Sequence, residues 1–220
     1  MFNEEKNIGA TLDETIDFLE STVSDWEIIV VDDGSTDLSA KVVKQKQTQR
    51  IELIRHKVNR GMGAGMATGI AAATKDVFIF NAADGQIPAA EIGKMLPLLN
   101  RADIVLSTYK DGRENRRRSL LSKAFRLYMT AIAGITFEME GLYLFPTMVA
   151  REIVDTISAE TFFFSFALIE KARKRGLTTA TATIICNPRK HGTSKVTGFS
   201  KIIRVAVDAL KFGIKTRLDR

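Results

Sequence analysis

Apolar residues follow two alternating spacings in the first half of this 220-residue chain, and this alternation restricts the fold more than any other feature. Ile8, Leu12 and Ile16 recur at the spacing of one helical face, whereas the continuous run 28–31 has the length of a buried strand. This order predicts an α/β fold in which helices flank a mixed, mostly parallel sheet. The predicted elements are a helix over 8–23, a strand over 27–31, a helix over 36–46, a strand over 51–54, a helix over 61–74, a strand over 76–80, a helix begun by Pro88 and a strand over 104–106.

The pattern changes in the second half of the chain. We expect a basic helix over 116–133, a strand over 142–145, two helices and a β-rich stretch over 178–186. The apolar run 162–169 predicts a core helix, because a membrane span needs about 18 apolar residues. With 45% hydrophobic residues and no linker, the chain is expected to form one domain that ends in an amphipathic helix over 196–220.

Two of the predicted strands end in acidic turns. The first strand leads into Asp32 and Asp33, and the strand over 76–80 leads into a turn that contains Asp84. Because the carboxyl ends of strands form the rim of the ligand crevice in an open α/β sheet, these carboxylates can converge on one ligand. The sequence therefore predicts a nucleotide site, or a site for a nucleotide together with a metal ion.

The net charge of +6 comes from basic residues that gather in two regions. Such regions suit phosphates, an anionic membrane surface or nucleic acid, and the alternative is a solvated helix face. With three Tyr and one Trp, the chain offers no aromatic platform beside the charge, so a nucleic-acid partner is not expected. The basic residues are Arg113, Arg116, Arg117, Arg118, Lys123 and Arg126, and then those from Arg189 to the C-terminus.

Cysteine and histidine usage narrows the class further. Cys186 is the single cysteine, so it cannot form an intramolecular disulfide, and the chain does not open with a signal-peptide pattern. These features predict a cytoplasmic location. His56 and His191 have no metal-ligand spacing to each other or to the cysteine, which argues against a zinc site.

The chain runs from Met1 almost directly into its first predicted helix. The strand that normally precedes this helix in such a sheet is therefore missing. A missing central strand would leave backbone groups of its neighbours unpaired, at about 1–3 kcal/mol each. This favours an N-terminus that is truncated or assigned too late.

Five segments in a fixed order resemble family 2 glycosyltransferases of the GT-A fold, in the branch of dolichol-phosphate mannose synthase and bacterial polyprenyl-phosphate glycosyltransferases. The resemblance extends from residue 2 to about 215. It implies one GT-A-like domain over 1–195, with a nucleotide-sugar-binding half over 1–109 and an acceptor-side half over 110–195. The segments are 2–5, 30–37, 59–61 with Gly63 and Gly69, 84–88 and 189–195.

The resemblance implies that the acidic strand ends hold a nucleotide-sugar donor. Asp32 and Asp33 would accept hydrogen bonds from the base and the ribose, and Glu4 and Gly61 would line the same site. Alternatively, Asp33 or Ser35 only caps the next helix. The glycines that begin at Gly61 also imitate a dinucleotide fingerprint, but the third glycine comes one residue early. We interpret them as close packing of a helix on the sheet.

The resemblance also implies a divalent cation, Mg²⁺ or Mn²⁺, on the donor diphosphate. Asp84 is the predicted ligand, with Gln86 as a second polar contact, because hard cations prefer oxygen ligands and substrate phosphates. The usual motif of the family has an earlier aspartate at the position of Ala82, which has no ligand atom. Asp84, Gln86 and Arg117 are the predicted catalytic residues.

The implied acceptor is a polyprenyl phosphate, which is ionised at pH 7 and needs no strong general base. Catalysis would then depend on positioning and on cations that offset phosphate repulsion. A guanidinium group can bind two phosphate oxygens at once through two parallel hydrogen bonds. The predicted acceptor-phosphate residues are Arg113, Arg117, Arg118, Arg189, Ser194 and Lys195.

The predicted function is transfer of a sugar, with inversion, from a UDP- or GDP-sugar to undecaprenyl or dolichyl phosphate. The basic amphipathic C-terminal helix would bind the anionic cytoplasmic face of the membrane as a peripheral contact. Alternatively, its apolar face packs on the domain. An alternative function is that of a membrane-associated binding or scaffold protein derived from a truncated transferase. This alternative is suggested by Ala82 and by the missing first strand.

Overall fold

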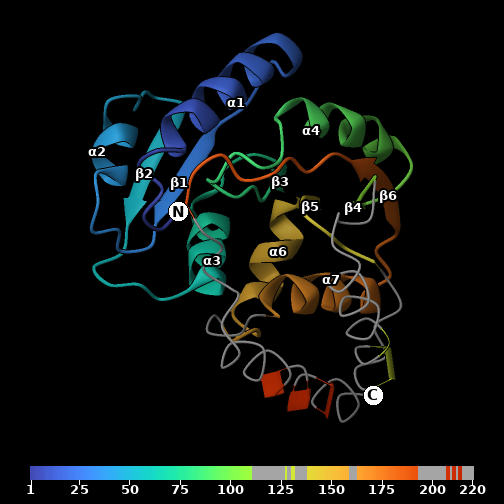
Figure 1. Cartoon of the computed structure of the whole chain (residues 1–220). Helices are drawn as coiled ribbons and strands as arrows, with labels where there is room; N and C mark the ends of the chain where they lie inside the picture. The colour runs from blue at the N-terminus through green and yellow to red at the C-terminus, as the bar shows by residue number, and fades with distance from the viewer. Residues whose placement is uncertain are drawn as a thin grey trace.

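The computed structural model describes residues 1–110, 138–158 and 163–192, with Leu127, Thr130, Ala131, Val207, Asp208, Leu210, Lys211, Gly213 and Ile214. Helices and strands alternate largely as predicted, and the described part of the chain is α/β (Figure 1). The elements are α1 (Ile8–Thr22), β1 (Ile28–Asp32), α2 (Ser39–Lys44), β2 (Ile51–Arg55), α3 (Met62–Ala72), β3 (Val77–Ile79), α4 (Ala90–Met95), the 3-10 helix η1 (Leu96–Asn100), β4 (Ile104–Tyr109), β5 (Tyr143–Pro146), α6 (Thr147–Val154), α7 (Phe164–Lys174) and β6 (Thr179–Ile184).

In the described part of the chain the strands form two sheets, where one was predicted. β1 and β2 pair in parallel, and β3, β5, β4 and β6 form a second sheet in that order. β5 is antiparallel to both β3 and β4, whereas β4 and β6 are parallel. The strand pairing is mixed, as predicted, but it is not mostly parallel. The predicted single sheet is divided between β1 and β3. The periodicity of side chains identifies strands, but it carries no information on which strands pair or in which direction.

Side chains of the second sheet alternate between two cores. Ile104 and Leu106 of β4 pack in a buried cluster with residues of α3, α6 and α7. Val105 of β4 and Leu144 of β5 pack on the opposite face, against α4. Figure 1 shows α4 on one side of this sheet and α6 with α7 on the other. The core helix predicted over 162–169 is confirmed from Phe164 onward.

The first sheet lies between helices as well. Ile8 and Leu12 of α1 form a buried cluster with Val30 of β1. On α3, a Cβ added to Gly69 would lie 3.7 Å from Cγ2 of Val31, so this helix packs closely on β1. Close packing of the glycine-containing helix on the sheet, as predicted, is confirmed at this position.

Gly34, in the turn after β1, is predicted to be a sensitive position. Its φ is 75°, and an added Cβ would lie 2.6 Å from the carbonyl carbon of Val58 and 2.7 Å from the backbone nitrogen of Asn59. Gly34→Ala should therefore lower the free energy of unfolding by roughly 2 kcal/mol or more, because strain and a backbone clash add. Gly176 is the control, since its φ is 92° but no atom lies within 4 Å of an added Cβ. Gly176→Ala should cost only about 1 kcal/mol in urea denaturation, and equal losses would contradict the prediction.

Candidate functional site

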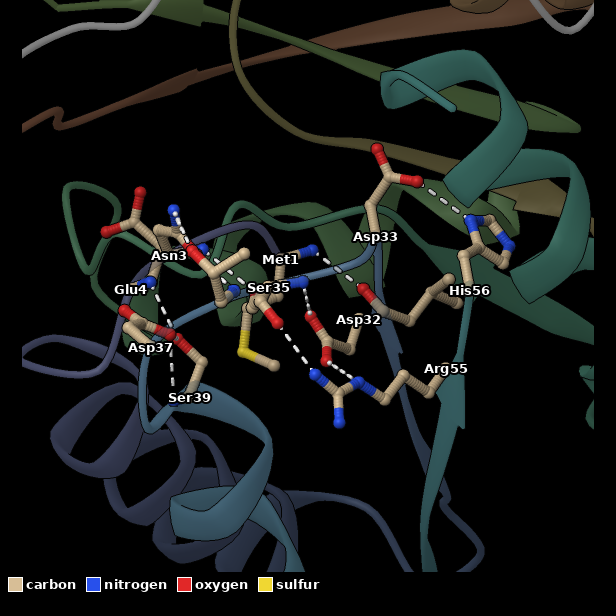
Figure 2. Close-up of polar contacts among 12 residues, drawn as sticks. Met1, Asn3, Glu4, Asp32, Asp33, Ser35, Asp37, Ser39, Arg55 and His56 are labelled. Carbon is tan, nitrogen blue, oxygen red and sulfur yellow. Dashed lines mark hydrogen bonds and ion pairs between the residues drawn. The ribbon is translucent and has the colours of Figure 1, made fainter. Parts of the chain in front are cut away.

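Residues 3–5 are hydrogen-bonded to the turn that follows β1. The backbone N–H groups of Asn3 and Glu4 donate to Oγ of Ser35 and Ser39, at 2.9 and 2.8 Å. In return, the backbone N–H of Thr36 donates to Oδ1 of Asn3 at 2.8 Å. Figure 2 shows Asn3 and Glu4 lying along this turn. These bonds place the Glu4 carboxylate beside the carboxyl end of β1.

Asp32, the last residue of β1, is fully buried. Its Oδ1 accepts the backbone N–H of Ser35 at 3.0 Å, and its Oδ2 forms an ion pair with Nε of Arg55 at 3.0 Å. Asp32 and Asp33 point in opposite directions in Figure 2, as successive residues of a strand do. The two aspartates predicted to act as a pair therefore lie in different surroundings.

Asp33 links three segments. Its Oδ1 accepts the backbone N–H of Arg60 at 2.8 Å and lies 2.8 Å from Nδ1 of His56, and its Oδ2 accepts the backbone N–H of Gly61 at 2.8 Å. Nε2 of His56 lies 2.9 Å from Oγ1 of Thr68 on α3. Asp33 thus fixes the loop before α3 against the end of β1.

The helix-capping alternative for this turn is wrong. α2 begins at Ser39, and neither Asp33 nor Ser35 caps it. The backbone N–H of Ser39 donates instead to Oδ1 of Asp37 at 2.9 Å. Because α2 begins only at Ser39, its first turn lies beyond the reach of the side chains of Asp33 and Ser35.

Because of Asp33, the free energy of unfolding should fall when the pH becomes acidic. Burial alone would raise the pKa of Asp33, but hydrogen bonds from Arg60, His56 and Gly61 outweigh it and hold the pKa below its ordinary value of 3.8. The ionised Asp33 therefore stabilises the folded protein. This contribution is complete above pH 3.8 and is lost as the pH falls through the lower pKa of the folded state.

Asp33→Asn tests this linkage. The variant should be less stable than the parent by about 1–3 kcal/mol at pH 7, because buried donors lose an ionised acceptor. Urea denaturation between pH 2 and 7 should show a smaller loss of stability below pH 4 in the variant. Parallel pH profiles for the two proteins would contradict the assignment.

An arginine connects the carboxylates of two distant segments. Nη2 of Arg189 donates to Oδ2 of Asp84 at 2.7 Å, and Nη1 lies 3.4 Å from Oε1 of Glu4. The other oxygen of Glu4 accepts Nδ2 of Asn7 at 2.7 Å, and the same Nδ2 lies 3.3 Å from the carbonyl oxygen of His191. We call Glu4, Asn7, Asp84 and Arg189 the arginine-bridged cluster. It holds the segment after β6 against the ends of β1 and β3.

Gln86 adds a second link between the turn after β3 and the segment after β6. The backbone N–H of Asn187 donates to the carbonyl oxygen of Gln86 at 2.7 Å, and Nε2 of Gln86 donates to the carbonyl oxygen of Asn187 at 3.1 Å. The backbone N–H of Gln86 also donates to Oδ1 of Asp84 at 3.1 Å. Both oxygens of Asp84 are thus engaged, one by Gln86 and one by Arg189.

A cavity of about 140 Å³ lies next to this cluster. Asp84, Gln86 and the methyl group of Ala82 contribute to its wall, so the metal-motif segment does border an open space. The cavity is also lined by residues that the sequence analysis did not select: Phe80, Ile87, Tyr109, Gly141, Leu142 and Cys186. For Phe80, directly after β3, and Tyr109, the last residue of β4, the place at a strand end is a signal that could have indicated them.

The predicted site residues are thus only partly brought together. Glu4, Asp84 and Arg189 meet in one cluster, and Asp33 and Gly61 are joined to each other by a hydrogen bond. Arg189, predicted for the acceptor phosphate, lies between two residues predicted for the donor. Asp32 lies apart from both groups in its ion pair with Arg55, and Gln86 lies beside Asp84. Five further predicted residues lie outside the described residues: Arg113, Arg117, Arg118, Ser194 and Lys195.

The chemistry of the cluster suits an anionic ligand with a cation. The cluster offers the guanidinium group of Arg189 for phosphate oxygens. Asp84, together with the adjacent Gln86, offers oxygen atoms for a metal ion. Within the described residues, no group of three or more His, Cys, Asp or Glu side chains could hold a metal on its own. A cation at this position would need oxygen ligands from the substrate.

Comparison with known sequences finds similarity to glycosyltransferases. A family model described as glycosyl transferase family 2 matches residues 1–172. Dolichyl-phosphate beta-glucosyltransferase ALG5C of Trichomonas vaginalis is 28% identical over 98% of this chain and 69% of its own length. Undecaprenyl-phosphate 4-deoxy-4-formamido-L-arabinose transferase of Pectobacterium atrosepticum is 27% identical over 96% of this chain and 64% of its own length.

Solved structures resemble the fold. Glucosyl-3-phosphoglycerate synthase from Mycobacterium tuberculosis, in a complex with Mn²⁺ and UDP, matches 100% of this chain and 76% of its own with a TM-score of 0.62 and 19% identity. A mannosyltransferase from Pyrobaculum calidifontis, in a complex with GDP-Man and Mn²⁺, matches 100% of this chain and 72% of its own with a TM-score of 0.64 and 18% identity. These similarities establish the GT-A fold.

Few residues of the predicted C-terminal amphipathic helix are described. Val207, Leu210 and Ile214 are helical and have exposed fractions of 44%, 43% and 52%. They are spaced at i, i+3 and i+7, which places them on one helical face. Among the described residues, no helix combines the length and the apolar character needed to cross a bilayer.

Proposed function

The chain belongs to glycosyl transferase family 2, and on that premise we propose that it transfers a sugar, with inversion, from a UDP- or GDP-sugar to a polyprenyl phosphate. The observation that carries the proposal is the arginine-bridged cluster at the rim of the cavity, where Arg189 joins Asp84 to Glu4. Relatives named as dolichyl- and undecaprenyl-phosphate transferases support the choice of acceptor.

The donor would lie across the ends of β1 and β3. Glu4 is held beside the end of β1, Asp84 follows the end of β3, and the two carboxylates meet at Arg189. Asp33 would act by holding the backbone of Gly61 and Arg60 in place, since its oxygens are already engaged there. Asp32 would accept a hydrogen bond from the base only if the residues that cover it move, because it is fully buried in its ion pair with Arg55.

A divalent cation fits the donor site when the substrate supplies ligands. Asp84 and Gln86 would hold it through oxygen atoms, and the donor diphosphate would complete its coordination. When bound, the cation neutralises charge that develops on the departing diphosphate. Structures with the same fold that contain Mn²⁺ support this choice. Ala82 leaves one carboxylate fewer than the usual motif provides.

The transfer step needs positioning more than proton transfer. An oxygen of the acceptor phosphate attacks the anomeric carbon, the bond from that carbon to the diphosphate oxygen breaks, and the nucleoside diphosphate departs with the electron pair. Attack from the opposite side inverts the configuration. The guanidinium of Arg189 would hold phosphate oxygens close to the reacting carbon, which reduces their repulsion.

The acceptor would be reached at the membrane surface. The exposed face of Val207, Leu210 and Ile214 supports a peripheral contact with lipid, because an apolar helical face beside basic residues can lie at the headgroup level. The net charge of +6 favours an anionic surface. The active site would then face lipid-linked phosphate on the cytoplasmic side.

Thermal unfolding with a panel of nucleotide sugars tests the proposal. A donor that binds the folded protein at about 100 times its Kd should stabilise it by about 2.7 kcal/mol and raise the Tm by several degrees. We expect a shift with UDP- or GDP-sugars that grows when Mg²⁺ or Mn²⁺ is present, and no shift with NAD. The absence of a shift with every donor would favour the binding-protein alternative and contradict the proposal.

A further inference from the structure

The loop between β2 and α3 leaves two apolar side chains in solvent. Val58 has an exposed fraction of 66%, and Met62, the first residue of α3, has one of 48%. The residues from Lys57 to Arg60 are all exposed. We call residues 57–62 the β2–α3 loop. Single apolar residues are normal on a protein surface, so the surroundings of these two decide whether they mark a binding surface.

The fold fixes the backbone of the β2–α3 loop. The N–H groups of Arg60 and Gly61 donate to the carboxylate of Asp33, each at 2.8 Å. The backbone of Val58 lies against the turn after β1, where a Cβ added to Gly34 would come within 2.6 Å of the Val58 carbonyl carbon. The side chain of Val58 is therefore held in solvent by a backbone that is itself well packed.

The loop is also basic. The segment 55–62 contains three cationic side chains and no acidic residue. Arg55 is paired with the buried Asp32, whereas no acidic side chain among the described residues forms an ion pair with Lys57 or Arg60. Exposed cations next to apolar side chains complement an anionic lipid surface, because the cations reach the headgroups and the apolar groups enter the acyl boundary. A protein partner is a poorer match, since lysine is depleted in protein interfaces.

The charges of the molecule favour one orientation on such a surface. Figure 1 shows α1 along the upper side, whereas the β2–α3 loop and the described residues within 207–214 lie on the lower side. An anionic membrane would repel α1 and attract the lower side. The apolar face of Val207, Leu210 and Ile214 therefore lies on the side that carries the loop. The sequence of α1 has no basic residue, and its exposed acidic residues are Asp13, Glu14, Asp17 and Glu20.

We propose that the β2–α3 loop is a second lipid-binding element, distinct from the C-terminal helical face. Val58 and Met62 enter an anionic membrane at the headgroup level, and Lys57 and Arg60 bind lipid phosphates. The loop follows the carboxyl end of β2, so this contact turns the carboxyl edge of the first sheet toward the lipid. The inference rests on the proposed function only in that a lipid-linked acceptor brings the protein to a membrane.

Co-sedimentation of the 220-residue chain with vesicles tests the proposal. The vesicles contain phosphatidylcholine and phosphatidylglycerol in equal parts, without polyprenyl phosphate or nucleotide sugar, so the result does not depend on sugar transfer. The double variant Val58→Ser, Met62→Ser should lower the vesicle affinity by about tenfold or more, because the inserted apolar groups are lost. Lys57→Gln should lower it by about fivefold, and by less at high salt.

Two exposed residues outside the loop provide matched controls. Met148 on α6 is 64% exposed, and Lys44, the last residue of α2, is exposed as well. Met148→Ser and Lys44→Gln should leave the vesicle affinity within about twofold of the parent. The proposal is overturned if the loop variants bind vesicles as the parent does, or if the control variants lose as much affinity as the loop variants. Equal binding of the parent to neutral and anionic vesicles would also overturn it and would leave a protein as the occupant of the loop.

A tryptophan placed in the loop reports on insertion directly. In Val58→Trp, lipids brominated near the headgroup should quench the fluorescence of the introduced tryptophan. They should spare Trp26, which is buried and precedes the amino end of β1. If UDP or GDP alters the emission of the introduced tryptophan and vesicles do not, the loop belongs to the donor site and the proposal is wrong. Loss of sugar transfer together with intact quenching would refute the proposed function and leave the lipid contact standing.

Discussion

Asp84→Ala is expected to lower kcat/KM for sugar transfer by roughly 100- to 1,000-fold, which corresponds to about 2.7–4 kcal/mol of lost transition-state stabilisation. Among the described residues that line the cavity, Asp84 is the one carboxylate, and its Oδ2 is 2.7 Å from the guanidinium of Arg189. Ala82, at the position where the usual motif of the family has an earlier aspartate, has no oxygen that could replace Asp84 at the diphosphate.

The fold of the Asp84→Ala variant should persist. The side chain of Asp84 bonds only to Gln86 and Arg189 among its described contacts, and Arg189 keeps its ion pair with Glu4. Asp25→Ala is the matched control, since Asp25 is an exposed aspartate that pairs with Lys75 near the amino end of β1. The Tm of both variants should be measured first, and their turnover should be compared once the two Tm values are found to be equal. Unchanged turnover in Asp84→Ala would remove the donor assignment.

Arg189→Ala is expected to have two effects of opposite sign. Transfer should fall by about 100-fold, because a paired guanidinium contact to phosphate is lost. The affinity of the substrate-free protein for Mn²⁺ should rise by roughly tenfold, since the positive charge between Glu4 and Asp84 no longer competes for their oxygens. A merely structural arginine would not produce the second effect.

Titration of Mn²⁺ by electron paramagnetic resonance measures the metal affinity, and initial rates measure the transfer. Arg189→Lys should keep the low Mn²⁺ affinity, because the charge remains, but should recover only part of the activity, because an ammonium group cannot form the paired contact. Arg175→Ala removes an exposed arginine that pairs with Glu152, and it should change neither quantity. An unaltered Mn²⁺ affinity in Arg189→Ala would refute the competition between arginine and metal.

Local periodicity was sufficient to predict most of the helices and strands. The helix that contains Gly69 and the strand over 142–145 both lie within a few residues of their predicted bounds. The periods of 3.6 and 2 depend on neighbouring residues alone, so they can be read without knowledge of the partner. The division of the sheet between β1 and β3 could not be read in this way, because pairing joins segments that are far apart in the sequence.

The sequence by itself determined the family, the order of the elements and the delivery of carboxylates to the ends of two strands. Only the tertiary structure separated the roles of those carboxylates. It engages Asp33 with the backbone of Arg60 and Gly61, and it brings Arg189 to Glu4 across 185 positions of the chain. The physical reason is range: strand and turn formation depend on adjacent residues, whereas an ion pair depends on where the completed fold places two charges.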